Sequence, residues 1–377
     1  MTTPVCDLIL LSWNHLDQTQ PCLESLFQST QAVPCRLIIV DNGSEPHVRE
    51  FLRSVKPAGA IQEVILLQND KNEGFPAGMN RGIRESRAPY VCLLNNDLIF
   101  TPLWLSKMIQ VAEAHPEIGV LNPASSTFGD YPPPGSSLEA YAQYLEVKRG
   151  LYVEVGMCIG FCMLIKRKVI DAVGLLTEEV ERIFFEDEDY CMRAKVAGYQ
   201  CVVVSGSYVH HAEHKTVTKM PEREALFSRN QQWCHEKWGR WLRIAVPRST
   251  EIRLDDPVLP DWLRQLVAWV RERTHVYVYA PMAMKVSKEE LFRAVGLVPH
   301  ADIHWHTVPT NFSRLSAAAA ILKRRKKPFH AIIAPDAQWE TQMRRLQWLH
   351  GAQVIPTANA NGLEQLWTAR FPSRSSS

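Results

Sequence analysis

The sequence lacks any run of about 18 apolar residues, the length that a membrane-spanning helix requires. It also opens without the basic residues of a signal peptide, so we expect no leader. Its formal net charge is only +2, which is too balanced to indicate a nucleic-acid-binding protein. The nine cysteines lack a paired metal-binding motif, which favours reduced, buried thiols in a cytosolic protein. What remains is a globular chain of 377 residues, long enough for two or three domains.

The first part of the chain alternates between strand-like and helix-like segments. Short apolar runs at residues 5–12, 36–41, 63–67 and 89–94 predict buried strands with helices between them. Such an alternation predicts βαβ units and a parallel sheet, in which ligands bind beyond the carboxyl ends of the strands. The polar residues that follow these strands should therefore converge on one cleft.

A glycine-containing segment follows the third predicted strand. Gly74 permits a tight turn, and Pro76 suits the first position of a helix. A helix that begins after a glycine turn offers backbone N–H groups to an anion. The alternative is structural, because Gly78 and Gly82 lie four residues apart and would let the same helix pack closely on a neighbour.

Two further polar groups suit a divalent cation. Asn95, Asn96 and Asp97 close a fully apolar strand, and a carboxylate placed there could hold a cation that bridges phosphates. A plain turn explains the same three residues equally well. His210 and His211 follow a later strand and could supply an imidazole ligand, although such a pair is more often solvated or structural.

The most unusual stretch has two phenylalanines followed by four consecutive acids that open a predicted helix. Acids favour the first turn of a helix, and Asp189 and Arg193 are spaced to form an ion pair, so a structural role is one interpretation. Asp187, however, shares a helix face with Cys191 and Ala194, which are apolar. A carboxylate held against an apolar face beside aromatic rings can act as a general base.

The composition changes at residues 247–260, where three prolines and several charges predict a linker. We therefore expect a first domain over 1–246 and a second over 261–372. The sequence of the second domain predicts a small doubly wound α/β fold of about four parallel strands, without a glycine fingerprint or acid cluster. Its many tryptophans suggest a role in binding a second substrate or a protein partner.

These motifs, in this order, resemble those of the family 2 inverting glycosyltransferases over about the first 245 residues. Residues 40–44 resemble the family's VDNGS turn, and 72–80 resemble its donor segment in rhamnosyl- and galactofuranosyltransferase-like members, with Pro76 where alanine is usual. Residues 95–97 are similar to the DxD motif with its first acid replaced by Asn. The resemblance implies a GT-A fold, a Rossmann-like α/β domain, followed here by the smaller α/β domain.

The resemblance also implies roles for individual residues. Asp187 would be the catalytic base, and Asp97 would bind Mg²⁺ or Mn²⁺ together with His210 or His211. Asp41 would contact the nucleotide base, and Asn95 would make the ribose contact that an acid makes in other members. The implied nucleotide-sugar contacts are Ser12, Asn14, Asp41, Asn72, Gly74, Gly78, Asn80, Asn95, Asn96 and Glu186.

The function implied is metal-dependent, inverting transfer of a hexosyl or deoxyhexosyl group from a UDP- or dTDP-sugar. The acceptor would be a glycan, a lipid-linked sugar or a protein, as in glycan or cell-surface polysaccharide synthesis. The expected location is the cytoplasm, with or without peripheral attachment to the inner face of the membrane through the C-terminal domain. Two alternatives are transfer to a polyprenyl phosphate, and a degenerate, non-catalytic transferase that serves as an interaction protein.

Overall fold

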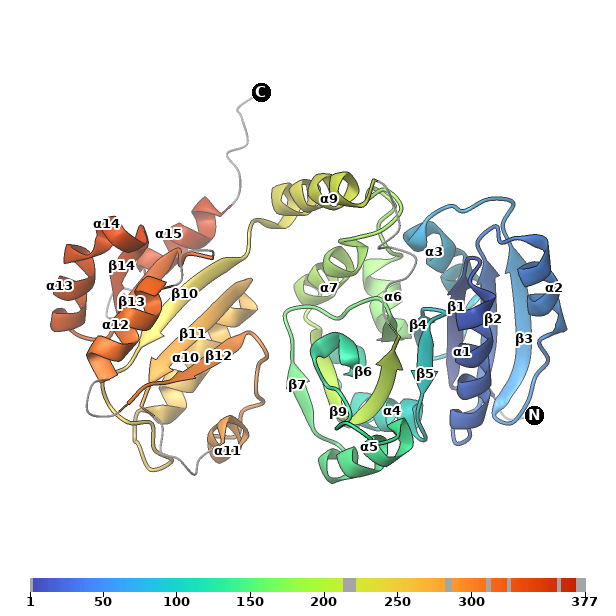
Figure 1. Cartoon of the computed structure of the whole chain (residues 1–377), viewed down its shortest axis with the longest axis horizontal. Helices are drawn as coiled ribbons and strands as arrows, with labels where there is room; N and C mark the ends of the chain where they lie inside the picture. Colours follow the sequence, from blue (N-terminus) through green and yellow to red (C-terminus); the bar gives the residue numbers. More distant parts are fainter. Residues whose placement is uncertain are drawn as a thin grey trace. The chain divides into compact units, whose positions relative to one another are not determined.

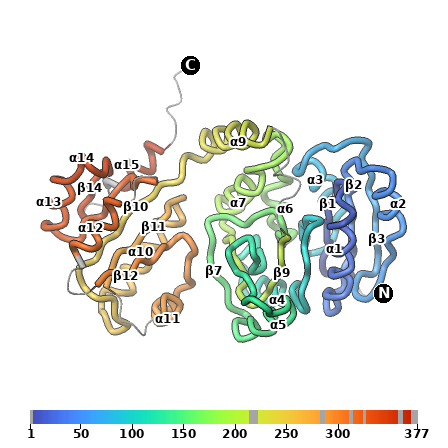
Figure 2. The backbone as a smooth tube through the Cα atoms, viewed as in Figure 1, coloured from blue at the N-terminus to red at the C-terminus, as the bar shows by residue number. Residues whose placement is uncertain are grey.

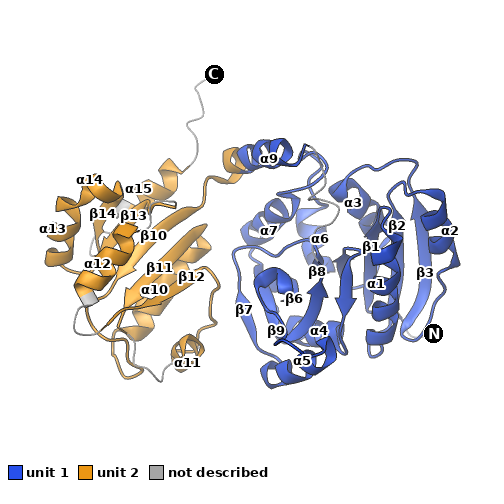
Figure 3. Cartoon of the chain, viewed as in Figure 1, with its two compact units in different colours: residues 1–234 blue, residues 235–377 orange. Residues whose placement is uncertain are grey.

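The computed structural model describes residues 3–212, 222–281, 287–309, 313–323, 327–357 and 361–370. The chain divides into two compact units, Met1–Cys234 (unit 1) and His235–Ser377 (unit 2), which are coloured separately in Figure 3. Among the described residues, no helix combines the length and the apolarity that crossing a bilayer requires. All nine cysteines are buried thiols, as the sequence predicted.

Unit 1 is built on one sheet with the strand order β3-β2-β1-β4-β8-β6-β9-β5, and β7 pairs with β9 (Figure 1). Its strands are β1 (Cys6–Ser12), β2 (Cys35–Asp41), β3 (Ile61–Gln68), β4 (Tyr90–Leu94), β5 (Leu98–Phe100), β6 (Ile118–Ala124), β7 (Tyr152–Glu154), β8 (Cys162–Lys166) and β9 (Gln200–His211). The predicted parallel arrangement holds for β1 to β4 and for β6 with β9. The sheet as a whole is mixed, because β5, β7 and β8 each run antiparallel to their neighbours.

Helices cover both faces of this sheet. Those of unit 1 are α1 (Leu16–Ser29), α2 (Pro46–Ser54), α3 (Phe75–Glu85), α4 (Trp104–Ala114), α5 (Leu138–Tyr144), α6 (Arg167–Val173) and α7 (Glu186–Val196), with short 3₁₀ turns η1 (Ser126–Phe128) and η2 (Leu145–Lys148). The helix α9 (Arg223–Trp238) contains the division between the two units. Side chains of α1, α2 and α4 pack on one face and those of α3, α6 and α7 on the other. The α/β class expected from the alternating sequence is thus confirmed.

The glycines of α3 let this helix approach the sheet closely. A Cβ atom on Gly82 would lie 2.4 Å from Ile9 Cγ2, and one on Gly78 would lie 2.5 Å from Leu11 Cδ1. Both distances are shorter than real Cβ contacts, so a larger residue at Gly82 would force the Ile9 side chain or the helix to shift, whereas rotation of the Leu11 side chain can relieve the contact at Gly78. The structural alternative considered for these two glycines therefore has direct support.

We expect Gly82→Ala to lower the free energy of unfolding by about 1–2 kcal/mol, measured by urea denaturation. Overpacking a core costs about 1–3 kcal/mol, which outweighs the gain of about 1 kcal/mol from replacing a helical glycine. Arg84→Ala, at an exposed site of the same helix, is the control and should stay within about 0.5 kcal/mol. A Gly82→Ala protein as stable as the wild type would show that α3 lies farther from the sheet.

Unit 2 has a second, smaller sheet in the order β12-β11-β10-β13-β14, with all neighbours parallel. The strands are β10 (Leu242–Pro247), β11 (Thr274–Ala280), β12 (Ile303–Thr307), β13 (Ala331–Ala334) and β14 (Gln353–Pro356), and the trace in Figure 2 shows β10, β11 and β12 side by side. The helices are α10 (Leu259–Arg271), α11 (Lys288–Ala294), α12 (Ser313–Lys323), α13 (Ala337–Arg345), α14 (Gln347–His350) and α15 (Asn361–Ala369). Apolar side chains of α10, α11 and α15 pack on one face, and those of α12 and α13 on the other. The doubly wound arrangement predicted for this part is present, with five strands in place of about four.

The division between the units falls earlier than the sequence placed it. The predicted first domain ran to residue 246 with a linker at 247–260, whereas the structure divides the chain between Cys234 and His235. The reason is β10, which lies in the middle of the second sheet and begins at Leu242. This short apolar run follows directly on α9 and is a strand only through its pairing with β11 and β13.

Candidate active site

The carboxyl ends of the first strands are tied together by backbone hydrogen bonds. Asn42 N donates to Ser12 O over 2.8 Å, which joins the ends of β1 and β2. Asn69 N donates to Asp41 O over 2.8 Å, which joins β2 to β3. Three of the polar segments that the sequence placed at one edge of the sheet therefore do meet there, as the parallel topology requires.

Asn14 and Asp41 shape the two turns at this edge. Asn14 adopts a left-handed backbone (φ 56°), and its Oδ1 accepts a hydrogen bond from Glu45 N over 2.8 Å. Asp41 is fully buried, and its two oxygens accept from Ser44 N at 2.9 Å and from Gln68 Nε2 at 3.1 Å. Arg49 Nε also lies 3.5 Å from Asp41 Oδ2, so protein groups already surround the buried carboxylate.

Asn42 holds the start of the predicted donor segment, residues 72–80, in place, a role that the sequence did not predict. Its Nδ2 donates to Asn72 Oδ1 at 3.0 Å and to Gly74 O at 3.1 Å. Its Oδ1 accepts from Asn69 Nδ2 at 2.8 Å and from Glu73 N at 3.1 Å. The buried Asn42 side chain therefore holds residues 72–74 against the end of β2, and the Asn72 side chain is one of its hydrogen-bond partners. The only sequence signal for it was its place in the turn at residues 41–44.

Gly74 and Phe75 bring the donor segment to the chain before α7. Gly74 has φ +89°, and a Cβ atom on it would lie 2.8 Å from Arg182 Cα. Phe75 N donates to Arg182 O over 2.6 Å. The Phe75 ring also reaches Gly160, where an added Cβ would lie 3.2 Å away. Gly74 and Phe75 thus contact Arg182, which precedes α7, and Gly160, whose N–H donates to Asp187.

Asn80, by contrast, attaches α3 to the chain that follows α6. Its Nδ2 donates to Leu176 O at 2.9 Å and to Glu178 Oε1 at 2.7 Å, and its Oδ1 accepts from Leu176 N at 2.9 Å. It is 1% exposed. The structure therefore gives Asn80 a tethering role and Gly78 a packing role, where the resemblance implied nucleotide contacts for both.

Asp97 and His211 are brought together by the pairing of β5 with the end of β9. In this antiparallel pair Leu98 lies opposite His211, which places Asp97 Oδ1 3.1 Å from His211 Nε2. The adjacent His210 points to the other face of the strand, where its Nδ1 lies 3.5 Å from the Tyr208 hydroxyl. The register therefore sets His211, rather than His210, against Asp97.

The Asp97–His211 pair fits a divalent cation. Asp97 Oδ1 is buried and accepts no hydrogen bond from the described residues, while it faces an imidazole nitrogen. The other ring nitrogen, His211 Nδ1, lies 2.8 Å from Thr127 Oγ1, a contact that fixes the ring as outer-shell partners of metal ligands do. Asn96 lies beside this pair in sequence, but its Nδ2 donates to Thr19 Oγ1 at 2.8 Å. The pair thus resembles a two-ligand site that phosphate oxygens could complete.

Asp187 lies in the first turn of α7, as predicted. Its Oδ2 accepts from Gly160 N at 3.2 Å and its Oδ1 accepts from Glu188 N at 2.8 Å. Burial raises the pKa of Asp187 to about 6, and the nearby Glu188 charge adds to the rise while the two hydrogen bonds oppose it. A carboxylate with this pKa can accept a proton near neutral pH.

The flanking acids have different surroundings. Glu186 is 4% exposed, and burial, followed by the Asp187 charge, raises its pKa well above its usual range. Its Oε2 has no hydrogen-bond partner among the described residues. Asp189 forms the predicted ion pair with Arg193, with Nε and Oδ2 2.8 Å apart. The four acids therefore do not share one role.

The dipeptide Gly160-Phe161 connects Asp187 to the Asp97–His211 pair. Gly160 N donates to the Asp187 carboxylate, and the Phe161 ring stacks on His211 with centroids 5.1 Å apart and planes 11° apart. Phe161 O accepts from Asn95 N at 2.8 Å, next to the loop that carries Asp97. The sequence predicted no functional role for this dipeptide, although a glycine inside an apolar run indicates that another part of the backbone approaches closely.

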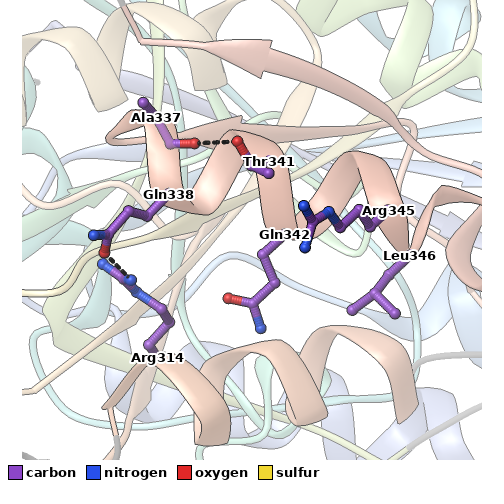
Figure 4. A pocket seen from close by; sticks show the side chains of 7 residues that line it. All are labelled: Arg314, Ala337, Gln338, Thr341, Gln342, Arg345 and Leu346. Atoms are coloured by element: carbon purple, nitrogen blue, oxygen red, sulfur yellow. Dashed lines mark hydrogen bonds between the residues drawn. The ribbon is translucent and has the colours of Figure 1, made fainter.

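A separate hollow of about 720 Å³ lies in unit 2 between α12 and α13 (Figure 4). It is lined by Arg314, Ala337, Gln338, Thr341, Gln342, Arg345 and Leu346. Arg314 bonds to Gln338 across it, and the lining contains neither a carboxylate nor a histidine. It therefore offers no group for acid–base or metal chemistry, and we place the candidate active site in unit 1.

The sequence model of the family described as glycosyl transferase family 2 matches residues 7–174. An uncharacterized protein y4gI of Sinorhizobium fredii is 26% identical over 261 residues, covering 63% of this chain and 28% of that protein. Glycosyltransferase AglE of Haloferax volcanii is 23% identical over 206 residues, covering 52% of this chain and 64% of that protein. A glucosyl-dolichyl phosphate glucuronosyltransferase of the same organism is 26% identical over 113 residues, covering 30% of this chain and 34% of that protein.

Solved structures also show some likeness. GalNAc-T7 with UDP, GalNAc and Mn²⁺ has a TM-score of 0.45 and 13% identity, and covers 55% of this chain and 43% of that chain. The mannosyltransferase PcManGT from Pyrobaculum calidifontis, in complex with GDP-Man and Mn²⁺, has a TM-score of 0.42 and 12% identity. That alignment covers 98% of this chain and 84% of that chain. At these scores the likeness supports no inference about the ligands of this chain.

Proposed function

Because unit 1 contains a family 2 glycosyltransferase domain, we propose that this chain transfers a sugar from a nucleoside diphosphate sugar to an acceptor hydroxyl, inverting the anomeric carbon. One observation carries the proposal. Gly160-Phe161 holds the Asp187 carboxylate on one side and the His211 ring on the other, so the candidate base and the candidate cation ligands form one site. A base and a cation site are the two parts that a direct displacement of a diphosphate requires.

Asp187 is proposed as the general base. Its carboxylate is fixed by Gly160 N and Glu188 N, and its raised pKa lets it take the proton from the acceptor hydroxyl as that oxygen attacks the anomeric carbon. Attack from the face opposite the leaving diphosphate inverts the configuration in one step. A single catalytic carboxylate is then sufficient, whereas a hydrolase that must protonate its leaving group uses two.

Asp97 and His211 are proposed to hold Mn²⁺ or Mg²⁺. When bound, such an ion neutralises charge that develops on the leaving diphosphate. The chain itself contributes the orientation of the ligands: Thr127 fixes one ring nitrogen of His211, and Phe161 stacks on the ring face. The turn at Asp41 and residues 72–74, which Asn42 holds in place, form the proposed nucleoside contacts. Glu186, Ser12 and Asn95 remain proposed neighbours of the same donor.

The acceptor defines a second candidate function. The similarity to a glucosyl-dolichyl phosphate glucuronosyltransferase favours a lipid-linked sugar as one acceptor class to test alongside soluble glycans. Transfer to a polyprenyl phosphate would use the same donor site but would need no general base, because a phosphate oxygen is already ionised at neutral pH. Full activity of an Asp187→Asn protein on a polyprenyl phosphate would therefore favour this second function.

The pH dependence of the rate tests the proposed base. Asp187 must be ionised to accept a proton, so kcat/KM with a donor and a hydroxyl acceptor should fall as the pH drops through about 6. Glu188→Gln removes a negative charge that raises the pKa of Asp187, so the same limb of the profile should move to lower pH. A rate that is flat from pH 5 to about 8 in both proteins would contradict an Asp187 base.

A further inference from the structure

Unit 2 contains a group of metal-ligand side chains at the amino ends of β11 and β12. His275, Asp302 and His304 each offer one ligand atom, and these atoms all lie within 4.8 Å of one another. His275 Nδ1 lies 3.0 Å from Asp302 Oδ1. The group belongs to a different unit from the Asp97–His211 pair and shares no residue with it.

The strand register explains why these residues meet. β11 and β12 are parallel, with Val276 opposite Ile303 and Tyr277 opposite His304. One step back along both strands, this register sets His275 beside Asp302. Because alternate residues of a strand point to the same face, His275, Asp302 and His304 all lie on one side of the sheet.

Aromatic contacts hold both imidazole rings in place. His275 stacks on Trp241, with centroids 5.0 Å apart and planes 26° apart. His304 stacks on Tyr277, with centroids 4.4 Å apart and planes 24° apart. The third ligand is fixed through its backbone, because Asp302 N donates to His300 Nδ1 over 3.1 Å. Ligands fixed in this way lose little freedom when they bind an ion.

We propose that His275, Asp302 and His304 bind a divalent transition metal, with Zn²⁺ as the best match. Two imidazoles and one carboxylate suit Zn²⁺, whereas Mg²⁺ and Ca²⁺ prefer oxygen ligands alone. Tetrahedral Zn²⁺ with bonds of about 2.0–2.2 Å holds its ligand atoms about 3.4 Å apart, which small side-chain rotations from the present spacing achieve. Three protein ligands leave one coordination position for water or another molecule.

Asp302 and Arg273 place opposite charges in this part of unit 2. The Asp302 carboxylate carries the negative charge, with His300 Nδ1 3.7 Å from its Oδ2. The guanidinium of Arg273 lies 4.9 Å from the centre of the Trp241 ring, the same ring on which His275 stacks.

The test is Zn²⁺ binding by the full chain, stripped with chelator and titrated by calorimetry at pH 7.5, with bound metal counted after gel filtration. The wild type should retain one Zn²⁺ per chain, and His304→Gln and Asp302→Asn should each lose at least about tenfold in affinity. His306→Gln is the matched control, because His306 is exposed on the same face of the same strand, where it stacks on Tyr279. Asp97→Ala should also retain the Zn²⁺, which separates this site from the candidate active site.

The melting temperature with and without Zn²⁺ is a second measurement, which shows whether a variant that binds no Zn²⁺ is still folded. Zn²⁺ should raise the melting temperature of the wild type and of His306→Gln, but not of the near-isosteric Asp302→Asn. The proposal is overturned if the wild type retains no Zn²⁺, or if His304→Gln and Asp302→Asn bind it as tightly as the wild type. It is also overturned if Asp97→Ala alone abolishes binding.

Discussion

Asp187→Asn should slow sugar transfer by about a hundred- to ten-thousandfold, the usual loss when a general base is removed. Asparagine keeps the size of the side chain and can still accept a hydrogen bond from Gly160 N or Glu188 N, so the start of α7 should keep its structure. Asparagine cannot take up the proton, so the substitution should lower the rate of the chemical step and leave donor binding unchanged. The dissociation constant of the donor, measured by calorimetry, should therefore stay within a fewfold of the wild-type value.

Glu188→Gln is the matched control for this substitution. Glu188 is the next residue of the same helix turn and is 4% exposed, and its replacement likewise exchanges a carboxylate for an amide. Near its optimum pH this variant should keep most of the activity. The assignment of Asp187 fails if Glu188→Gln loses the activity and Asp187→Asn keeps it.

His211→Ala and Asp97→Ala should each reduce transfer by about a hundredfold or more. Charge stabilisation by a bound metal is worth several kcal/mol, and each substitution removes one of the two proposed ligands, whose atoms Asp97 Oδ1 and His211 Nε2 lie 3.1 Å apart. Donor affinity should fall together with turnover, because the proposed ion would contact the diphosphate of the bound donor. The measurement is a steady-state rate with Mn²⁺ varied, beside donor binding with and without EDTA.

His210→Ala is the matched control for the cation site. It removes an imidazole one residue away, on the opposite face of β9, where the side chain lies near Tyr208. It should retain near wild-type activity and the same Mn²⁺ dependence. Equal losses in His210→Ala and His211→Ala, or full wild-type activity in EDTA, would count against a cation at Asp97 and His211.

Much of the candidate site could be predicted from the sequence, because local sequence patterns determine it. Apolar runs located β1 to β4, and the rule that ligands lie beyond parallel strands correctly joined residues 12–14 to 41–44. Helical spacing paired Asp189 with Arg193 and left Asp187 on a different face, as the structure has it. These features depend on neighbours within one turn or one strand.

Other features depend on pairings between distant segments, which spacing does not reveal. The choice between His210 and His211 depends on β5, a strand of three residues that is too short to show a pattern. The motif predicts that Asn80 contacts a ligand, whereas its side chain forms a hydrogen bond with Leu176, which is distant in the sequence. The boundary between the units was misplaced for a similar reason, because β10 becomes a strand only by pairing with β11 and β13.

The most direct test of the central claim is the release of nucleoside diphosphate from a panel of nucleoside diphosphate sugars. The full chain would be incubated with each donor, Mn²⁺ and a mixture of hydroxyl acceptors, with the Asp187→Asn and Asp97→Ala proteins in parallel. We expect the wild type to release diphosphate from at least one donor, Asp187→Asn to bind that donor without turnover, and Asp97→Ala to be impaired in both. Binding of no donor by the wild type, or release at the wild-type rate by both variants, would contradict the account.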